Sequence, residues 1–153
     1  MHSAIALPAS LQQAIQSGDT SKALDATVEY FSCAVGSVHW FNPTKNLLEL
    51  AAQTNLPPQV AELVRAVPLG KGIAGAAAQR REPVSICNLQ TDTSGTVQPS
   101  AKTTGMEGAL AVPILKGDQL LGVIGIGKSQ AYEWSTAEMA LLTQIGRAVG
   151  DCR

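Results

Sequence analysis

Apolar residues recur at every third or fourth position in the N-terminal part of the chain, which is the period of an α-helix. Ser10 can cap a first, short helix that ends at Gly18. Asp19 or Thr20 can then start a second helix, so we expect two helices within residues 1–34. The apolar stripe of the second helix consists of Leu24, Val28 and Phe31.

The next part of the chain has the pattern of a β-hairpin followed by a helix. Residues 35–41 are rich in β-branched and aromatic side chains, residues 42–46 have turn chemistry, and residues 47–53 form the returning strand. Pro57 or Pro58 suits the first turn of the helix that follows. The short apolar face of that helix consists of Val60, Leu63 and Val64.

A glycine-rich turn, Gly70-Lys71-Gly72, opens a segment of small residues. Its glycines can take positive φ, and the turn resembles either an anion site at a helix start or a plain backbone turn. We expect a helix over residues 73–81 that lies close to a sheet or a ligand, because its side chains are small. A short strand at 83–86 follows. Residues 87–106 then form a polar loop whose length is typical of a lid or a binding loop.

The last part of the chain predicts a hairpin and a helix. Gly117-Asp118 is a two-residue turn between strands at 109–116 and 119–127. Both strands are almost continuously apolar, so we expect them to be central and covered on both faces. The final helix, over residues 135–150, starts at a capping box of Ser135 and Glu138, and Gly150 suits its C-terminal cap. Its buried stripe consists of Leu142, Ile145 and Val149.

This order of elements predicts a single α+β domain over residues 1–153. The N-terminal helices occupy residues 1–34, the sheet and pocket residues 35–128, and the C-terminal helix residues 135–150. We expect a central antiparallel sheet with the terminal helices on one face. The small-residue helix and the long loop then cover a pocket on the other face.

Charge and composition exclude several classes of function. The formal net charge is -1, and Lys and Arg do not cluster beyond Arg80-Arg81, which argues against nucleic acid and against an anionic membrane surface. No apolar run reaches the ~20 residues of a membrane span. A signal peptide is also not visible, so we expect a cytoplasmic protein.

The titratable residues predict no catalysis. The three cysteines are widely spaced, and neither histidine has a nearby ligand partner, so no metal site is expected. The second half of the chain holds no histidine, which removes the usual general base. His39 is alone in the first strand, where a structural or surface position is favoured over a ligand contact or heme coordination.

Several short motifs follow one another along the chain. They are Leu69-Gly70-Lys71-Gly72-Ile73-Ala74-Gly75, Glu82-Pro83-Val84-Ser85-Ile86, Asn88 to Asp92, Ala111-Val112-Pro113-Ile114 and Leu121-Gly122-Val123-Ile124, continued by Trp134, Glu138 and Leu142. In their order and spacing these motifs resemble a GAF domain. The resemblance covers nearly the whole chain and implies the sheet-and-pocket layout shared with PAS domains, with terminal helices that commonly mediate dimers and pass signals to output domains.

The resemblance also implies where a ligand would bind. We expect the ligand to lie under the loop of residues 87–106, and the sequence does not identify it or any cofactor. Cys87 borders this region and is either a ligand-contacting or redox-sensing thiol or a small buried residue at a strand end. The expected ligand contacts are Trp40, Gly72, Ile73, Ala77, Cys87, Asn88, Asp92, Thr93, Thr103 and Met106.

Differences from the motifs of two GAF subclasses argue against two kinds of ligand, cyclic nucleotides and bilins. Cyclic-nucleotide-binding members carry an Asn-Lys-Phe-Asp-Glu signature, and the matching positions here are Gly127, Lys128, Trp134, Ala137 and Glu138, of which only the Lys and the Glu agree. Bilin-binding members need a cysteine with neighbouring His and Asp residues, and this chain has no histidine beyond His39 after its N-terminus, which argues against photoreception.

We therefore expect a non-catalytic sensory or regulatory domain that binds a small molecule and forms a homodimer. One alternative is a ligand-free interaction or dimerisation module whose pocket is filled by its own side chains. A thiol-based free methionine-(R)-sulfoxide reductase is less well supported, because Ala74 occupies the cysteine position of the glycine-rich turn and Cys87 is the only thiol of the loop.

Overall fold

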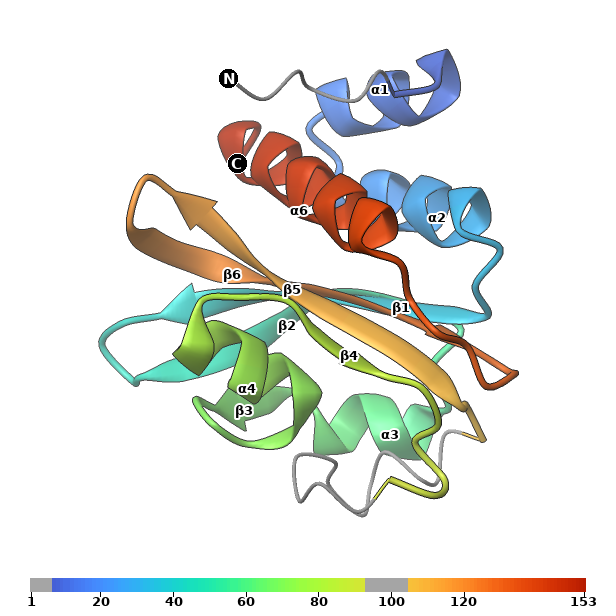
Figure 1. Cartoon of the computed structure of the whole chain (residues 1–153). Helices are drawn as coiled ribbons and strands as arrows, with labels where there is room; N and C mark the ends of the chain where they lie inside the picture. The colour runs from blue at the N-terminus through green and yellow to red at the C-terminus, as the bar shows by residue number, and fades with distance from the viewer. Residues whose placement is uncertain (1–6, 93–104) are drawn as a thin grey trace.

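The computed structural model describes residues 7–92 and 105–153. Within them, six strands form one sheet in the order β3-β2-β1-β6-β5-β4, and every neighbouring pair is antiparallel (Figure 1). The predicted α+β fold with a central antiparallel sheet is therefore confirmed. The strands are β1 Val35–Asn42, β2 Leu47–Thr54, β3 Ala66–Pro68, β4 Val84–Ile86, β5 Gly108–Lys116 and β6 Gln119–Lys128; the helices are α1 Ala9–Gln16, α2 Thr20–Tyr30, α3 Pro58–Leu63, α4 Gly72–Arg80 and α6 Thr136–Asp151.

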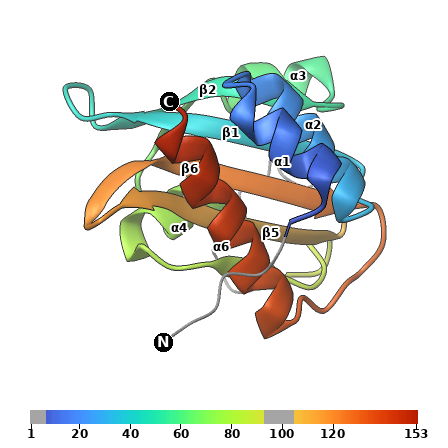
Figure 2. The ribbon, with the colours of Figure 1, turned by 90° about the horizontal axis from the view of Figure 1, so that it is seen from above.

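The terminal helices α1, α2 and α6 all lie on one face of the sheet (Figure 1). Seen from above, α6 crosses β5 and β6, while α2 lies over β1 and β2 (Figure 2). A single apolar cluster joins these helices to the sheet, and Leu24, Leu142 and Ile145 are fully buried in it. The predicted placement of the terminal helices is confirmed.

Two helix starts are capped as the sequence predicts. The Asp19 carboxylate accepts a hydrogen bond from the Lys22 backbone N–H over 3.2 Å at the start of α2. At the start of α6, Ser135 Oγ accepts from the Glu138 N–H over 3.1 Å, and Glu138 Oε1 accepts from the Ser135 N–H over 2.9 Å. These caps satisfy backbone donors that the first helical turn leaves free.

Two other helix predictions are wrong. α1 begins at Ala9 rather than after a Ser10 cap, because Pro8 already has the extended backbone of the residue that precedes a helix. Gly150 does not end the last helix but lies buried within α6. A Cβ atom at this position would lie 2.7 Å from Ile114 Cγ2, so the glycine lets α6 approach β5 closely.

The sequence did not predict strand β3, which pairs with β2 at the edge of the sheet. It has three residues and ends in a proline, so it carries neither the length nor the alternation of a recognisable strand. The strand connects α3 to the turn before α4. It thereby holds both of these helices on the face opposite the terminal helices (Figure 1).

The small-residue helix α4 lies directly on this opposite face, as expected. Ala76, Ala77 and Ala78 are buried against the sheet, in a second cluster that includes Leu48 and Val123. The preceding turn uses its glycines as predicted, because Gly70 and Gly72 have φ of 84° and 66°. The Gly70-Lys71-Gly72 segment is therefore a backbone turn that positions α4 against the sheet.

Candidate functional site

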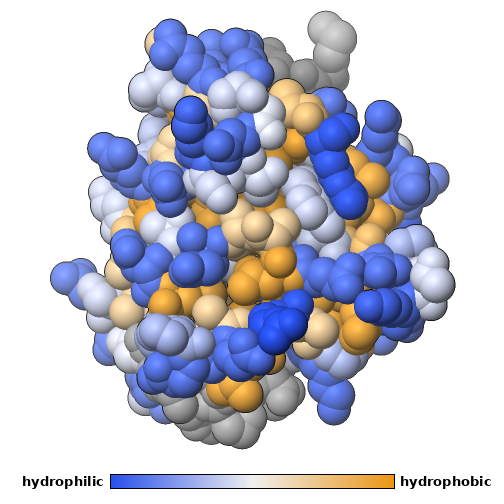
Figure 3. All heavy atoms as spheres, turned by 180° about the vertical axis from the view of Figure 1, so that it is seen from behind, coloured by the Kyte–Doolittle hydropathy of each residue, from blue (hydrophilic) through white to orange (hydrophobic). Residues whose placement is uncertain are grey.

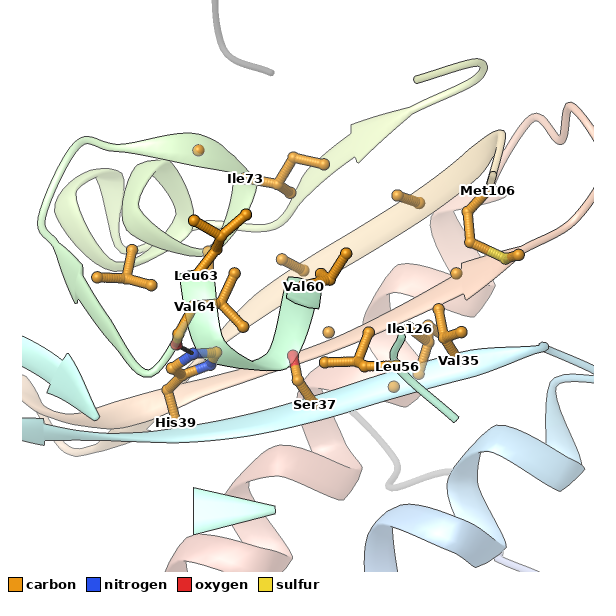
Figure 4. A pocket seen from close by; sticks show the side chains of 18 of the residues that line it. Val35, Ser37, His39, Leu56, Val60, Leu63, Val64, Ile73, Met106 and Ile126 are labelled. Atoms are coloured by element: carbon orange, nitrogen blue, oxygen red, sulfur yellow. Dashed lines mark hydrogen bonds between the residues drawn. The ribbon is translucent and has the colours of Figure 1, made fainter. Parts of the chain in front are cut away.

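A cavity of about 450 Å³ lies between the sheet and the helices α3 and α4 (Figure 4). This volume is within the range of about 300–1,000 Å³ that is typical of small-molecule sites. β1, β5 and β6 form its floor, and α3, β3 and the start of α4 form its walls. Its lining includes Val35, Ser37, His39, Leu56, Val60, Leu63, Val64, Val67, Lys71, Gly72, Ile73, Ala74, Leu89, Met106, Ala109, Ala111, Gly125, Ile126 and Gly127.

The cavity exists because the central strands carry small residues on one face and large residues on the other. In β6, Gly125 and Gly127 face α3, and in β5 the matching positions are Ala109 and Ala111. A Cβ atom at Gly125 would meet only ordinary contacts at 3.6–3.9 Å, so the space above it is open. The large residues of the other face include Val112, Ile114 and Ile124, all in the cluster under the terminal helices.

The predicted apolar face of α3 supplies the opposite wall. Val60 is buried, and Val64 and Leu63 also line the cavity (Figure 4). Leu63 remains 61% exposed, which places it at the edge of the cavity. The walls and floor together make a predominantly apolar site, which favours ligands with a large apolar surface.

His39 is the polar side chain buried most deeply in this site, at 2% exposed. Its Nε2 lies 2.8 Å from the Val64 carbonyl oxygen, so Nε2 carries the hydrogen and donates. Burial lowers the pKa of His39, although the hydrogen bond to Val64 acts in the opposite direction. The imidazole is therefore neutral at pH 7, and its Nδ1 is a hydrogen-bond acceptor without a partner among the described residues.

Two further polar side chains line the cavity. Ser37 lies two residues before His39 in β1 and faces the same side of the sheet (Figure 4). Lys71 is exposed and occupies the N-cap position of α4. No Asp, Glu or Cys is among the described residues that line the cavity.

Three of the expected ligand contacts line the cavity, namely Gly72, Ile73 and Met106. Thr93 and Thr103 lie outside the described residues. Asn88 and Asp92 lie at the start of the long loop and do not line the cavity. The Asn88 side chain instead accepts a hydrogen bond from the Gln90 N–H over 2.9 Å, which organises the loop itself.

The expectation that Trp40 belongs to the pocket is wrong. Successive residues of a strand point to opposite faces, and Trp40 follows His39 directly in β1. Its side chain packs with the terminal-helix cluster, and the Arg153 guanidinium lies 4.5 Å from the centre of its ring.

Ala77 and Cys87 are also placed differently from the expectation. Ala77 is fully buried where α4 rests on the sheet, so it supports the cavity without lining it. Cys87 is exposed rather than buried at the strand end, and it does not line the cavity. Its carbonyl oxygen accepts a hydrogen bond from the Tyr132 N–H over 3.0 Å.

The sequence reasoning missed the residues that define the floor. Ala109, Ala111, Gly125 and Gly127 alternate with large apolar residues, and this alternation of sizes was a usable signal for a hollow face. His39 had no such signal, because its role depends on where α3 places the Val64 carbonyl.

The remaining titratable residues do not gather into a metal site or a thiol pair. Among the described residues, no group of three or more His, Cys, Asp and Glu side chains could hold a metal ion. Burial raises the pKa of the Cys33 thiol to about 11, which disfavours the thiolate that redox chemistry requires. No described helix has the length and hydrophobicity that crossing a bilayer would require.

A model of the GAF domain family matches residues 20–152, and the chain therefore belongs to the GAF domain family. No curated protein sequence matches the chain. The family assignment agrees with the antiparallel six-stranded sheet and its helices.

Solved structures show the same fold. The GAF domain from a Coxiella burnetii phosphoenolpyruvate-protein phosphotransferase has a TM-score of 0.76 at 18% identity, over 92% of this chain and 88% of that one. The corresponding domain from Acinetobacter gives 0.74 at 19% identity, over 94% and 89%. A free methionine-R-sulfoxide reductase from Neisseria meningitidis, solved with its substrate, gives 0.73 at 16% identity, over 99% and 95%. At these identities the likeness concerns the fold alone.

Proposed function

We propose that this GAF domain is a non-catalytic regulatory module that binds a small molecule in the cavity between α3, α4 and the sheet. The observation that carries the proposal is the cavity itself, with its volume of about 450 Å³ and its floor of glycine and alanine. The domain acts in the cytoplasm as a homodimer, and its terminal helices transmit the bound state. Two similar structures are GAF domains from phosphotransferase proteins, so this fold occurs within proteins that have another activity.

A chain of contacts leads from the cavity to the terminal helices. Gly125 and Gly127 line the cavity, and the next residue, Lys128, ends β6. The Lys128 ammonium group donates a hydrogen bond to the Phe31 carbonyl at the end of α2 over 2.5 Å. A movement of this end of β6 would therefore change the hydrogen bond at the end of α2.

The same lysine reaches the start of α6. Lys128 Nζ lies 4.6 Å from the centre of the Tyr132 ring and 5.5 Å from that of Trp134. Tyr132 in turn donates through its hydroxyl group to Glu138 Oε2 over 2.6 Å, and Glu138 belongs to the capping box of α6. Ligand binding would bias this set of contacts between two arrangements, which is how a regulatory domain shifts a population.

The apolar floor supplies a direct test of the proposal. Gly125→Ile places a branched side chain in the cavity, where the position has open space. Ser85→Ile is the matched control, because Ser85 is exposed in edge strand β4 and does not line the cavity. Native mass spectrometry of freshly purified protein and titration with naphthalene, an apolar probe, then compare the three proteins.

We expect the wild-type protein and Ser85→Ile to bind the probe or a co-purified molecule with the same affinity. Gly125→Ile should lose at least about tenfold in affinity, because the added side chain occupies the ligand's volume. Equal binding by all three proteins would contradict a site in this cavity.

The two alternatives have less support. A ligand-free interaction module would have a pocket filled by its own side chains, whereas small residues leave this floor open. The exposed large hydrophobic residues among those described are Tyr30 and Leu63. On the rear surface, hydrophobic residues are divided by hydrophilic ones (Figure 3). A thiol-based reductase has no support from the cysteines, since none of the three lines the cavity.

A further inference from the structure

The polar end of the cavity consists of two groups on the same face of β1. His39 Nδ1 is buried without a hydrogen-bond partner among the described residues, and Ser37, which is half-buried, lines the cavity beside it. Buried polar atoms are usually satisfied, because an unpaired one loses its hydration without compensation. An orphaned acceptor at the floor of a hollow site is therefore an observation that points to a ligand.

The contact with Val64 determines what His39 can bind. Because Nε2 donates to the Val64 carbonyl, the neutral ring must carry its lone pair on Nδ1. A lone pair accepts a hydrogen bond from an O–H or N–H group and repels a carboxylate or phosphate oxygen. The surrounding walls are apolar, which penalises a charged group at this depth.

We propose that the cavity binds an uncharged, mainly apolar molecule that donates one hydrogen bond, from a hydroxyl or an N–H group, to His39 Nδ1. Ser37 Oγ lies two residues away on the same strand face and forms the second polar contact. Because Nδ1 is buried in this structure, the groups that cover it must move for the ligand to reach it. This inference rests on the proposed function and specifies the chemical class of its ligand.

Naphthalene and two of its derivatives distinguish the contribution of the hydrogen-bond donor from that of the apolar ring system. 2-Naphthol offers a hydroxyl donor, 2-methoxynaphthalene keeps the oxygen without the donor, and naphthalene lacks both. 2-Naphthoate is added to detect an anion site near Lys71, the cation at the start of α4. Calorimetric titration of the full chain at pH 7.5 measures each affinity.

The wild-type protein should bind 2-naphthol at least about tenfold more tightly than either uncharged analogue, because only 2-naphthol pairs the buried acceptor. His39→Phe should reduce this preference to about twofold or less. Trp40→Phe is the matched control, because Trp40 is the next residue of β1 but lies on the other face, and it should keep the full preference.

The outcomes distinguish this inference from the proposed function. Equal affinities of the three uncharged probes for wild-type protein, all abolished by Gly125→Ile, would overturn the donor inference and leave the binding site intact. Tightest binding of 2-naphthoate would also overturn it, in favour of an anion site. Failure of every probe to bind would overturn both. If His39→Phe does not fold, the affinities of the probes for wild-type protein test the donor inference by themselves.

Discussion

The Nε2–H group of His39 donates a hydrogen bond to the backbone carbonyl of Val64 over 2.8 Å. His39 belongs to the floor of the cavity, and Val64 ends the short helix that forms its wall. One side-chain contact therefore ties α3 to the sheet. Because α3 has six residues, it depends on such tertiary contacts for its stability.

The first prediction concerns this tether. His39→Phe removes the donor and leaves the Val64 carbonyl unpaired, which should cost about 1–2 kcal/mol of unfolding free energy. The amides of Ala61 and Val64, which donate within α3, should exchange with solvent faster than in wild-type protein. Hydrogen exchange followed by NMR measures this, with Trp40→Phe as control. Unchanged protection of α3 would contradict the tether.

The second prediction concerns pH. Because burial lowers the pKa of His39 below 6.5 in the folded protein, the unfolded chain binds more protons as the pH falls through 6.5. The contribution of His39 to the free energy of unfolding is therefore fully present above pH 6.5 and declines below it. The pKa of Glu138 is also lowered, from 4.5, by hydrogen bonds from Ser135 and Tyr132 that outweigh its burial, so its contribution is lost only at lower pH.

Urea unfolding between pH 7.5 and 5 isolates the histidine. The wild-type protein should lose stability over this interval, and His39→Phe should show a flatter profile. Parallel profiles for the two proteins would mean that His39 has the same pKa in the folded and unfolded chains.

The third prediction uses two glycines of β6. A Cβ atom at Gly122 would overlap the carbonyl oxygen of His39, whereas one at Gly125 would meet only ordinary contacts. Gly122→Ala should therefore destabilise the protein by about 2 kcal/mol or more. Gly125→Ala should leave stability unchanged or raise it by about 0.5–1 kcal/mol, since glycine weakens a strand interior. Thermal unfolding measures both, and equal losses would contradict an open floor at Gly125.

The fourth prediction tests the contacts of Lys128. Lys128→Met removes the hydrogen bond to Phe31 and the contacts with the Tyr132 and Trp134 rings, which should cost about 1–2 kcal/mol. The pKa of Glu138 should rise, because the nearby cation helps to lower it. NMR titration of the Glu138 carboxyl group measures this shift.

A matched control is available at the surface. Lys45 lies 3.8 Å from the Glu49 carboxylate in an exposed ion pair. Lys45→Met should change the stability by less than about 0.5 kcal/mol and leave the Glu138 pKa unaltered. If the two lysine variants behave alike, Lys128 does not link β6 to α6.

Elements set by local chemistry could be predicted from the sequence. Asp19 and the Ser135–Glu138 pair act as caps because their hydrogen bonds involve residues within one helical turn. Gly150 does not act as the predicted C-terminal cap. A glycine is needed there because α6 lies close to Ile114, a residue 36 positions away in the chain (150 − 114). Strand β3 was missed because only its pairing with β2 defines it.

The candidate site was only partly predictable, because some of its contacts join residues that are far apart in the chain. Gly72 and Ile73 line the cavity because they start the helix that covers it, as the turn chemistry indicates. Trp40, an expected ligand contact, lies on the other face of β1, because successive residues of a strand alternate between the two faces. His39 depends on the placement of Val64, which is 25 residues further along the chain, and no local pattern encodes that contact.

The central claim is that a small molecule binds in this cavity and that the terminal helices respond. The most direct test is a backbone and methyl NMR titration of wild-type and Gly125→Ile protein with 2-naphthol. The account predicts shifts in wild-type protein at Val35 and Ile73, which line the cavity, and at Phe31 and Glu138 beyond Lys128, with all four lost in Gly125→Ile. Shifts that persist in Gly125→Ile, or that leave Val35 and Ile73 unmoved, would contradict it.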